Sequence, residues 1–122
     1  MSVQVSAKIS LIITTCKRCK HFLQLIKTLY DNCSDIDIIN EVIIIDDNSN
    51  MKDKHKMQEF IKVTFSSKIH SRLVSTNKKG QFNSISYTLK NIIPKNDIVM
   101  LLEDDWVFSK QFRLYDIVYN LW

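Results

Sequence analysis

The sequence predicts an α/β domain in which a parallel sheet is covered by helices on both faces. Short β-branched runs alternate with longer segments whose apolar residues recur at helical spacing, and this alternation repeats along the chain. Parallel strands in such an order are joined by right-handed crossovers. A length of 122 residues suits one domain, and a hydrophobic content of 45% predicts a packed core rather than disorder. We therefore expect residues 1–122 to form a single domain.

The first half of the chain contains two predicted strand–helix units. Residues 8–15 are typical of a strand buried on both faces, and residues 17–32 carry apolar side chains at helical spacing. Residues 40–45 form the second predicted strand, and a second helix is expected at about residues 53–65. The apolar positions that recur at helical spacing in the first helix are Phe22, Leu25, Ile26, Leu29 and Tyr30. Those expected on the inner face of the second are Met57, Phe60 and Ile61.

The second half repeats this pattern with a weaker strand at residues 72–75 and a helix at residues 81–92, which Pro94 ends. Residues 97–102 form the fourth predicted strand. Ser109 is a candidate N-cap for a last helix. The apolar positions expected in this last helix are Leu114, Tyr115, Val118, Leu121 and Trp122.

Polar residues follow each predicted strand at its carboxyl end. These polar clusters are residues 14–15, 46–47, 77–80 and 103–105. Because the carboxyl ends of parallel strands meet at one edge of the sheet, we expect the four clusters to converge there. Residues of a strand point alternately to opposite sides, which predicts that Asp104 points away from its two acidic neighbours.

The triplet Glu103-Asp104-Asp105 places three carboxylates in a row, and like charges repel unless they are solvated, hydrogen-bonded or neutralised by a cation. Taken alone, the triplet is also typical of an acidic turn. Carboxylate oxygens suit Mg²⁺ or Mn²⁺, which bind diphosphates with only one or two protein carboxylates. Gly80 is the only glycine, whereas glycine-based phosphate cradles need several. A diphosphate would therefore be held by a metal and side chains.

Composition disfavours several other classes of protein. The net charge of +4 is mild, and the densest basic patch, within residues 52–56, has no aromatic stacking platform beside it, so no nucleic-acid partner is expected. The longest apolar runs are too short to span a bilayer, and no signal peptide is visible. We expect a cytoplasmic protein whose three cysteines are reduced.

Four segments in this order, ISLIITTCKR, EVIIIDDNS, NKKG and DIVMLLEDDW, resemble the nucleotide-binding half of glycosyltransferases with the Rossmann-like GT-A fold, most closely those of family 2. The resemblance covers almost the whole chain. It implies a nucleotide-diphosphate sugar as donor, with a UDP-sugar favoured, and Mn²⁺ or Mg²⁺ as cofactor. It also implies that the chain is the N-terminal part of a longer enzyme, in contact with a C-terminal half that supplies the catalytic base. No catalytic base is assigned in this chain, and the acceptor is unknown.

The resemblance assigns a base pocket at the ends of the first two strands. Thr14 and Cys16 match positions that line the uracil pocket, although an aromatic residue is common where Cys16 stands. Asp47, with Asp46 beside it, matches the carboxylate that accepts a hydrogen bond from the uracil ring or the ribose.

The resemblance also assigns a diphosphate site. Glu103-Asp104-Asp105 matches the motif written DxD, in which Asp104 would hold ribose or sugar hydroxyls and Asp105, with Glu103, would bind the metal. Gly80 matches a glycine of the loop before the third helix. The usual arginine at the start of that helix is missing, because residues 84–86 are Ser-Ile-Ser, so Lys79 or its neighbour Lys78 is expected to supply the positive charge.

Three alternatives remain at this stage. Cys16 and Cys19 form a CxxC pair between a strand and a helix, which is typical of thioredoxin-like redox domains. Zinc ligation by these cysteines with His21 and Cys33 is disfavoured, because the last three of the four fall on one helix. A non-catalytic nucleotide-sugar-binding module is the third alternative.

Overall fold

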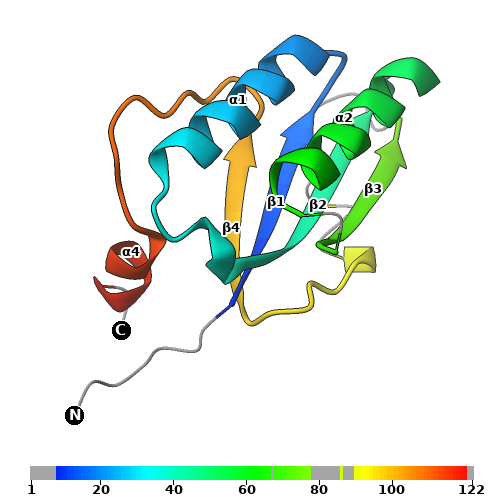
Figure 1. The fold of residues 1–122 in the computed structure, drawn as a ribbon. Coiled ribbons are helices and arrows are strands. Elements are labelled where there is room, and N and C mark those ends of the chain that lie inside the picture. The colour runs from blue at the N-terminus through cyan, green and yellow to red at the C-terminus, as the bar shows by residue number, and fades with distance from the viewer. Residues whose placement is uncertain (1–7, 67, 78–85, 87–89, 121–122) are drawn as a thin grey trace.

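A computed structural model of the chain describes residues 8–66, 68–77, 86 and 90–120. Its core is a four-stranded parallel sheet with the strand order β3-β2-β1-β4 (Figure 1). The strands are β1 (Ile9–Thr15), β2 (Ile39–Asp47), β3 (His70–Thr76) and β4 (Ile98–Glu103). The helices are α1 (Cys19–Asn32), the short 3-10 helix η1 (Ile36–Ile38), α2 (Met51–Thr64) and α4 (Leu114–Asn120). The predicted α/β architecture is confirmed.

The two central strands, β1 and β2, have apolar side chains on both faces. Every residue of β1 is buried, as this short run rich in β-branched residues predicted. One set of alternating residues joins the main core under the helices, namely Leu11, Ile13, Val42 and Ile44. The other set forms a smaller cluster on the opposite face, namely Ile12, Ile43 and Ile45.

Helices α1 and α2 cover the first of these faces side by side (Figure 1). Their buried residues are Phe22, Leu25, Ile26 and Leu29 of α1 and Met57 and Ile61 of α2. Tyr30, which continues the helical spacing of the apolar residues, is 46% exposed. Helix α2 begins earlier than predicted, because the side chain of Asn50 accepts a hydrogen bond of 2.8 Å from the Asp53 N–H and caps the helix at Met51.

The second face of the sheet is less covered in the described part of the chain. Val74 and Ile92 pack on the smaller cluster there. The predicted third helix, residues 81–92, lies mostly outside the described residues, although residues 90–91 are helical. On β4, Val99 and Leu101 point to this face and are 41% and 46% exposed.

The predicted last helix begins later than expected. Ser109 does not cap it, because residues 109–113 are not helical. Instead Asp35, far away in the sequence, accepts hydrogen bonds from the N–H groups of Leu114 at 2.7 Å and Tyr115 at 2.8 Å. A cap formed by a residue outside the local segment cannot be read from helical periodicity. None of the helices among the described residues has both the length and the apolar character needed to cross a bilayer.

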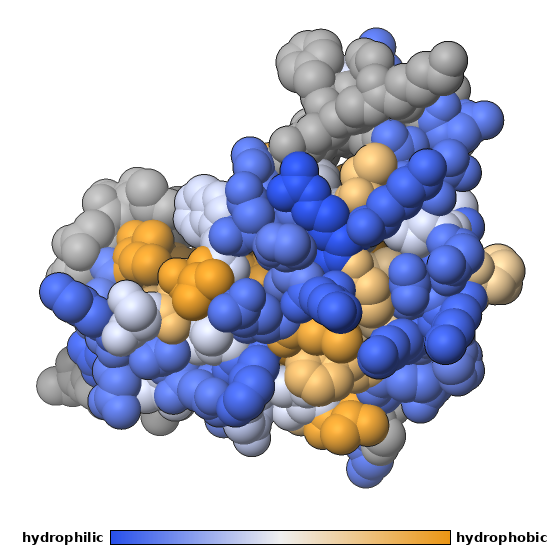
Figure 2. Space-filling model, turned by 90° about the horizontal axis from the view of Figure 1, so that it is seen from above, coloured by the Kyte–Doolittle hydropathy of each residue, from blue (hydrophilic) through white to orange (hydrophobic). Residues whose placement is uncertain are grey.

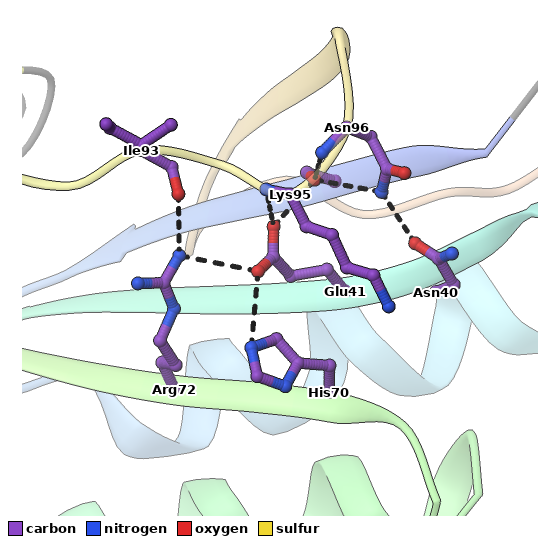
Figure 3. Close-up of polar contacts among 8 residues, drawn as sticks. Asn40, Glu41, His70, Arg72, Ile93, Lys95 and Asn96 are labelled. Carbon is purple, nitrogen blue, oxygen red and sulfur yellow. Dashed lines mark hydrogen bonds and ion pairs between the residues drawn. The ribbon is translucent and has the colours of Figure 1, made fainter.

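A buried carboxylate ties the strands together at their amino-terminal ends (Figure 3). Glu41 of β2 is 1% exposed. Its Oε1 accepts hydrogen bonds of 2.7 Å from both Ser10 Oγ of β1 and the Lys95 N–H. Its Oε2 lies 3.3 Å from Arg72 Nη2 and 3.6 Å from His70 Nε2, both on β3. The network therefore fastens the chain segment that leads into β4 to the three other strands.

Candidate functional site

The carboxyl ends of the four parallel strands form the upper edge of the sheet in Figure 1. The register pairs Thr14 with Glu103 across β1 and β4, and Asp47 with Thr76 across β2 and β3. The polar clusters that follow β1, β2 and β4 therefore lie at one edge, as predicted. Strand order reverses between β1 and β4, because the chain runs from β1 through β2 to β3 and then returns to the other side of β1. Ligand sites of open parallel sheets lie at such a reversal.

Asp104 is fixed at this reversal by contacts with β1. Thr15 Oγ1 donates a hydrogen bond of 2.9 Å to Asp104 Oδ2, and the Asp104 N–H donates one of 3.1 Å to the Thr14 carbonyl. Arg18 Nη1 lies 3.7 Å from Asp104 Oδ1. Asp104 is only 6% exposed. A carboxylate held in this way is oriented before any ligand arrives.

The two acidic neighbours of Asp104 are exposed, as the predicted alternation requires, although β4 ends at Glu103 and Asp104 and Asp105 lie in the turn after it. In the part of the chain that the structure describes, the side chains of Glu103 and Asp105 have no hydrogen bond or ion pair. Their oxygens fit Mg²⁺ or Mn²⁺, which bind one or two carboxylates and complete their shell with water or phosphate. Among the described residues, no group of three or more histidine, cysteine, aspartate or glutamate side chains could hold a metal ion. A cation held by Glu103 and Asp105 would complete its coordination shell with water or with oxygens of a bound molecule.

Asp47 lies on the β2–β3 side of the same edge. Thr76 Oγ1 donates a hydrogen bond of 3.3 Å to its Oδ1, and Cys16 Sγ lies 3.9 Å from its Oδ2. Burial and then the negative charge of Asp47 raise the pKa of the Cys16 thiol, against the opposing charge of Lys17. Burial also raises the pKa of Cys19, followed by the charge of Asp53. Raised pKa values disfavour the thiolate that redox exchange requires, so the structure gives no support to a thioredoxin-like pair.

Asp46 is fully buried and closes the turn after β2. Its Oδ2 accepts a hydrogen bond of 3.1 Å from the Ser49 N–H, and Ser49 Oγ in turn accepts one of 3.2 Å from the Lys17 N–H. The loops that follow β1 and β2 are thereby joined. Asp46 Oδ1 has no hydrogen-bond partner within the described chain. A buried carboxylate oxygen without a partner costs stability, and it is typical of a functional site that a ligand or ion completes.

The residues of the predicted site that follow β3, Lys79 and Gly80, lie outside the described residues. Figure 2 shows the carboxyl edge from above, where hydrophilic side chains occupy the middle of the surface. A cavity of about 410 Å³ lies at the opposite, amino-terminal edge, between residues such as Asn40, Phe65 and His70. That cavity is remote from the acidic clusters, so its size does not make it the better candidate for the chemistry described above.

Thr76 and Arg18 were not singled out from the sequence, and Thr15 was noted there only as a member of the polar cluster 14–15. Thr15 and Thr76 orient Asp104 and Asp47, and Arg18 forms an ion pair with Asp104. Thr76 is the last residue of β3, as Thr15 is of β1, and this position could have drawn attention to it. Nothing local to Arg18 indicates its partner, because the contact depends on β4 pairing with β1.

Comparison with known proteins agrees with this geometry. The family described as glycosyl transferase family 2 matches residues 10–121. The chain belongs to this family. The resemblance noted in the four sequence segments is therefore confirmed, and the chain is a glycosyltransferase family 2 domain. No curated protein sequence matches it significantly.

Two solved structures have the same fold as this family 2 domain. The mannosyltransferase PcManGT from Pyrobaculum calidifontis, determined in complex with GDP-Man and Mn²⁺, is 15% identical with a TM-score of 0.65. TarS from S. aureus is 20% identical with a TM-score of 0.66. The matches cover 85% and 92% of this chain but only 29% of PcManGT and 19% of TarS. The predicted Rossmann-like GT-A fold is thereby confirmed.

Proposed function

We propose that this family 2 domain binds a nucleoside-diphosphate sugar, with a UDP-sugar as the donor, through a divalent cation, as the donor-binding part of a glycosyltransferase. The observation that carries the proposal is that the three carboxylates of the acidic triplet differ in burial and in contacts. Asp104 is buried and held by β1, whereas Glu103 and Asp105 on either side of it are exposed and, in the described chain, have no partner. One carboxylate is thus pre-oriented, and two are accessible to a cation.

In this proposal each carboxylate has its own ligand. Asp105, with Glu103, would hold Mn²⁺ or Mg²⁺, and Asp104 would accept hydrogen bonds from ribose or sugar hydroxyls. When bound, the cation offsets the negative charge that develops on the leaving diphosphate during sugar transfer. PcManGT was determined with GDP-Man and Mn²⁺, which supports a metal-dependent donor in this family 2 domain as well.

The uracil ring of the donor nucleotide would bind near β2. The contact between Cys16 and Asp47 and the turn closed by Asp46 support a shared pocket for uracil and ribose, with Thr14 at the adjoining strand end. Lys79 and Gly80 stay part of the proposal as residues of the diphosphate site. The three free cysteines support a reducing location such as the cytoplasm.

The acceptor site would come from another part of the enzyme. Among the described strands β4 lies at an edge of the sheet, and its exposed Val99 and Leu101 lie on the face that the described residues cover less. Open strand edges and adjacent apolar side chains are typical of surfaces that another segment covers. These features support contact with a C-terminal half that supplies the acceptor pocket and the catalytic base.

Calorimetric titration tests the proposal on the full chain with UDP and GDP, each with and without Mn²⁺. We expect UDP to bind more tightly than GDP, Mn²⁺ to be required, and Asp105→Ala to weaken binding at least about 10-fold, which corresponds to about 1.4 kcal/mol. Asp37→Ala is the matched control, because Asp37 is exposed at the opposite edge of the sheet. If UDP binding is unaffected both by the removal of Mn²⁺ and by Asp105→Ala, the proposed metal site is refuted. A preference for GDP would refute the assignment of uracil as the nucleobase of the donor.

A further inference from the structure

Arg18 is the only basic residue that forms an ion pair with the acidic edge among the residues that the structure describes. It lies in the loop between β1 and α1, directly before the first residue of the helix. Its guanidinium is half-exposed, with 52% of the side chain accessible, whereas the side chain of Asp104 is 8% accessible. A half-exposed cation thus lies beside a buried anion.

The contact between Arg18 and Asp104 is loose. Its distance of 3.7 Å is beyond hydrogen-bonding range, and exposed ion pairs contribute little to stability. Asp104 also has other partners, since the Thr15 hydroxyl donates to it at 2.9 Å and its own N–H binds the Thr14 carbonyl. The guanidinium can therefore leave Asp104 without releasing the carboxylate from β1.

The surroundings of Arg18 need a positive charge if they are to bind a phosphate. Carboxylates from the ends of β2 and β4 dominate this edge and would repel a diphosphate at short range. Helix α1 begins next to Arg18 with no acidic residue in its first turn and no side-chain cap, so the partial positive charge of its N-terminus adds to that of the guanidinium. The planar fork of arginine also matches two phosphate oxygens at once.

We propose that Arg18 is a phosphate-binding residue of the donor site, which rests on Asp104 while the site is empty and moves to the diphosphate when the donor binds. The inference rests on the proposed function and adds a residue to it. The movement would have two effects. It supplies positive charge to the diphosphate, and it frees Asp104 Oδ1 to accept a hydroxyl of the donor.

The first test compares ligands with and without a diphosphate in the full chain. Arg18→Gln should weaken binding of UDP in the presence of Mn²⁺ by about 10- to 100-fold, the range expected for a lost hydrogen bond to a charged group. Binding of uridine, measured by ligand-observed NMR, should stay unchanged. Lys20→Gln is the control, because it removes the same charge from an exposed position in the first turn of α1 and should change neither affinity. Arg18→Lys should give an intermediate loss, since it keeps the charge but not the fork.

The second test uses Mn²⁺ alone, read from the electron paramagnetic resonance signal of the free ion. Because Arg18→Gln removes a positive charge from beside the acidic triplet, the variant should bind Mn²⁺ more tightly than the wild type does. One substitution is thus expected to change affinity for metal and for diphosphate in opposite directions. A purely structural role would weaken both.

The outcomes separate this inference from the proposed function. If the wild type binds UDP and Arg18→Gln binds it equally well, the inference is wrong and the proposed function stands. Equal losses for UDP and uridine would assign Arg18 a structural role and also overturn the inference. If the wild type binds no nucleoside diphosphate, the proposed function itself fails. Thermal melting of each variant verifies that the fold is retained.

Discussion

Cys16 shows how single residues at the carboxyl edge respond to their neighbours. Its thiol is exposed but lies 3.9 Å from the Asp47 carboxylate, and Asp46 and Asp104 add further negative charge. Burial of the sulfur and these charges all raise the pKa of the thiol, and Lys17 opposes them only in part. Little thiolate is therefore present at neutral pH, and exposure alone does not make this cysteine reactive.

We predict that Cys16 reacts with iodoacetamide at pH 7.5 more slowly than free cysteine does. Asp47→Asn should accelerate the reaction, because the substitution removes the largest electrostatic cause of the raised pKa. Mass spectrometry of the peptide that contains Cys16 measures the rate. Cys33 serves as an internal reference, since burial raises its pKa to about 11 and it should stay unmodified. Rapid formation of a disulfide between Cys16 and Cys19 would contradict the prediction.

At the scale of elements, the helices differ in the origin of their caps. The cap of α2 is local, because Asn50 accepts a hydrogen bond from the N–H three residues later. The cap of α4 is remote, because Asp35 reaches its N–H groups across a gap of 79 residues in the sequence. The strands differ similarly, since β1 is buried along its length and β4 is buried mainly on the side of the helices.

The local cap can be tested directly. Asn50→Ala should lower the free energy of unfolding by about 1 kcal/mol, because the Asp53 N–H loses its acceptor at the helix end. Urea unfolding followed by circular dichroism measures the change. Asn50→Ser preserves an acceptor oxygen and should cost much less. Equal losses in the two variants would show that the cap hydrogen bond is not the cause.

The two faces of β4 provide a matched pair of core substitutions. Leu102→Ala should lower the free energy of unfolding by about 2–5 kcal/mol, because Leu102 is 3% exposed in the main core. Leu101→Ala should cost less than about 1 kcal/mol, because that side chain is 46% exposed. Chemical denaturation of both variants measures the difference. A comparable loss for Leu101→Ala would show that another segment covers this face.

At the scale of the whole molecule, the hydrogen bonds and ion pairs of Glu41 connect strands that lie far apart in the sequence. Glu41 is buried, and burial alone would raise its pKa. Hydrogen bonds from the Lys95 N–H and the Ser10 hydroxyl, together with the charges of Arg72 and His70, outweigh burial and lower the pKa below its ordinary value of 4.5. The folded state therefore favours the carboxylate of Glu41.

This shift predicts the sign of a pH effect on stability. A carboxyl group with a lowered pKa stabilises the fold above its ordinary pKa of 4.5, and the stabilisation is lost as the pH falls through the lowered value. Glu41→Gln should therefore make the unfolding free energy less sensitive to acid below pH 4.5, and should lower it by about 1–3 kcal/mol at pH 7. Urea titrations at several pH values measure both effects. The control is Glu59→Gln on the exposed surface of α2, which should leave the acid slope unchanged.

Much of this molecule could be predicted because its elements have local signals. The apolar runs of β1 and β2 and the helical spacing of Phe22, Leu25 and Leu29 follow from periodicity alone. The exposure of Glu103 and Asp105 on either side of buried Asp104 agrees with the alternation expected from the sequence, although only Glu103 belongs to β4 and the other two residues lie in the turn after it. The order of the acidic and polar clusters also sufficed to identify the family, which the match over residues 10–121 confirmed.

The sequence by itself thus determined the four strands, the helices that the structure describes, their order and the acidic edge of the sheet. Only the tertiary structure decided which residues meet there. Thr15 and Asp104 are 89 positions apart, and they touch because β4 pairs with β1 in parallel. Periodicity records which side of an element is apolar, but it contains no information on strand order or register. The placement of Arg18 on Asp104 and of Asp35 at the start of α4 depends on both, so neither contact could be foreseen.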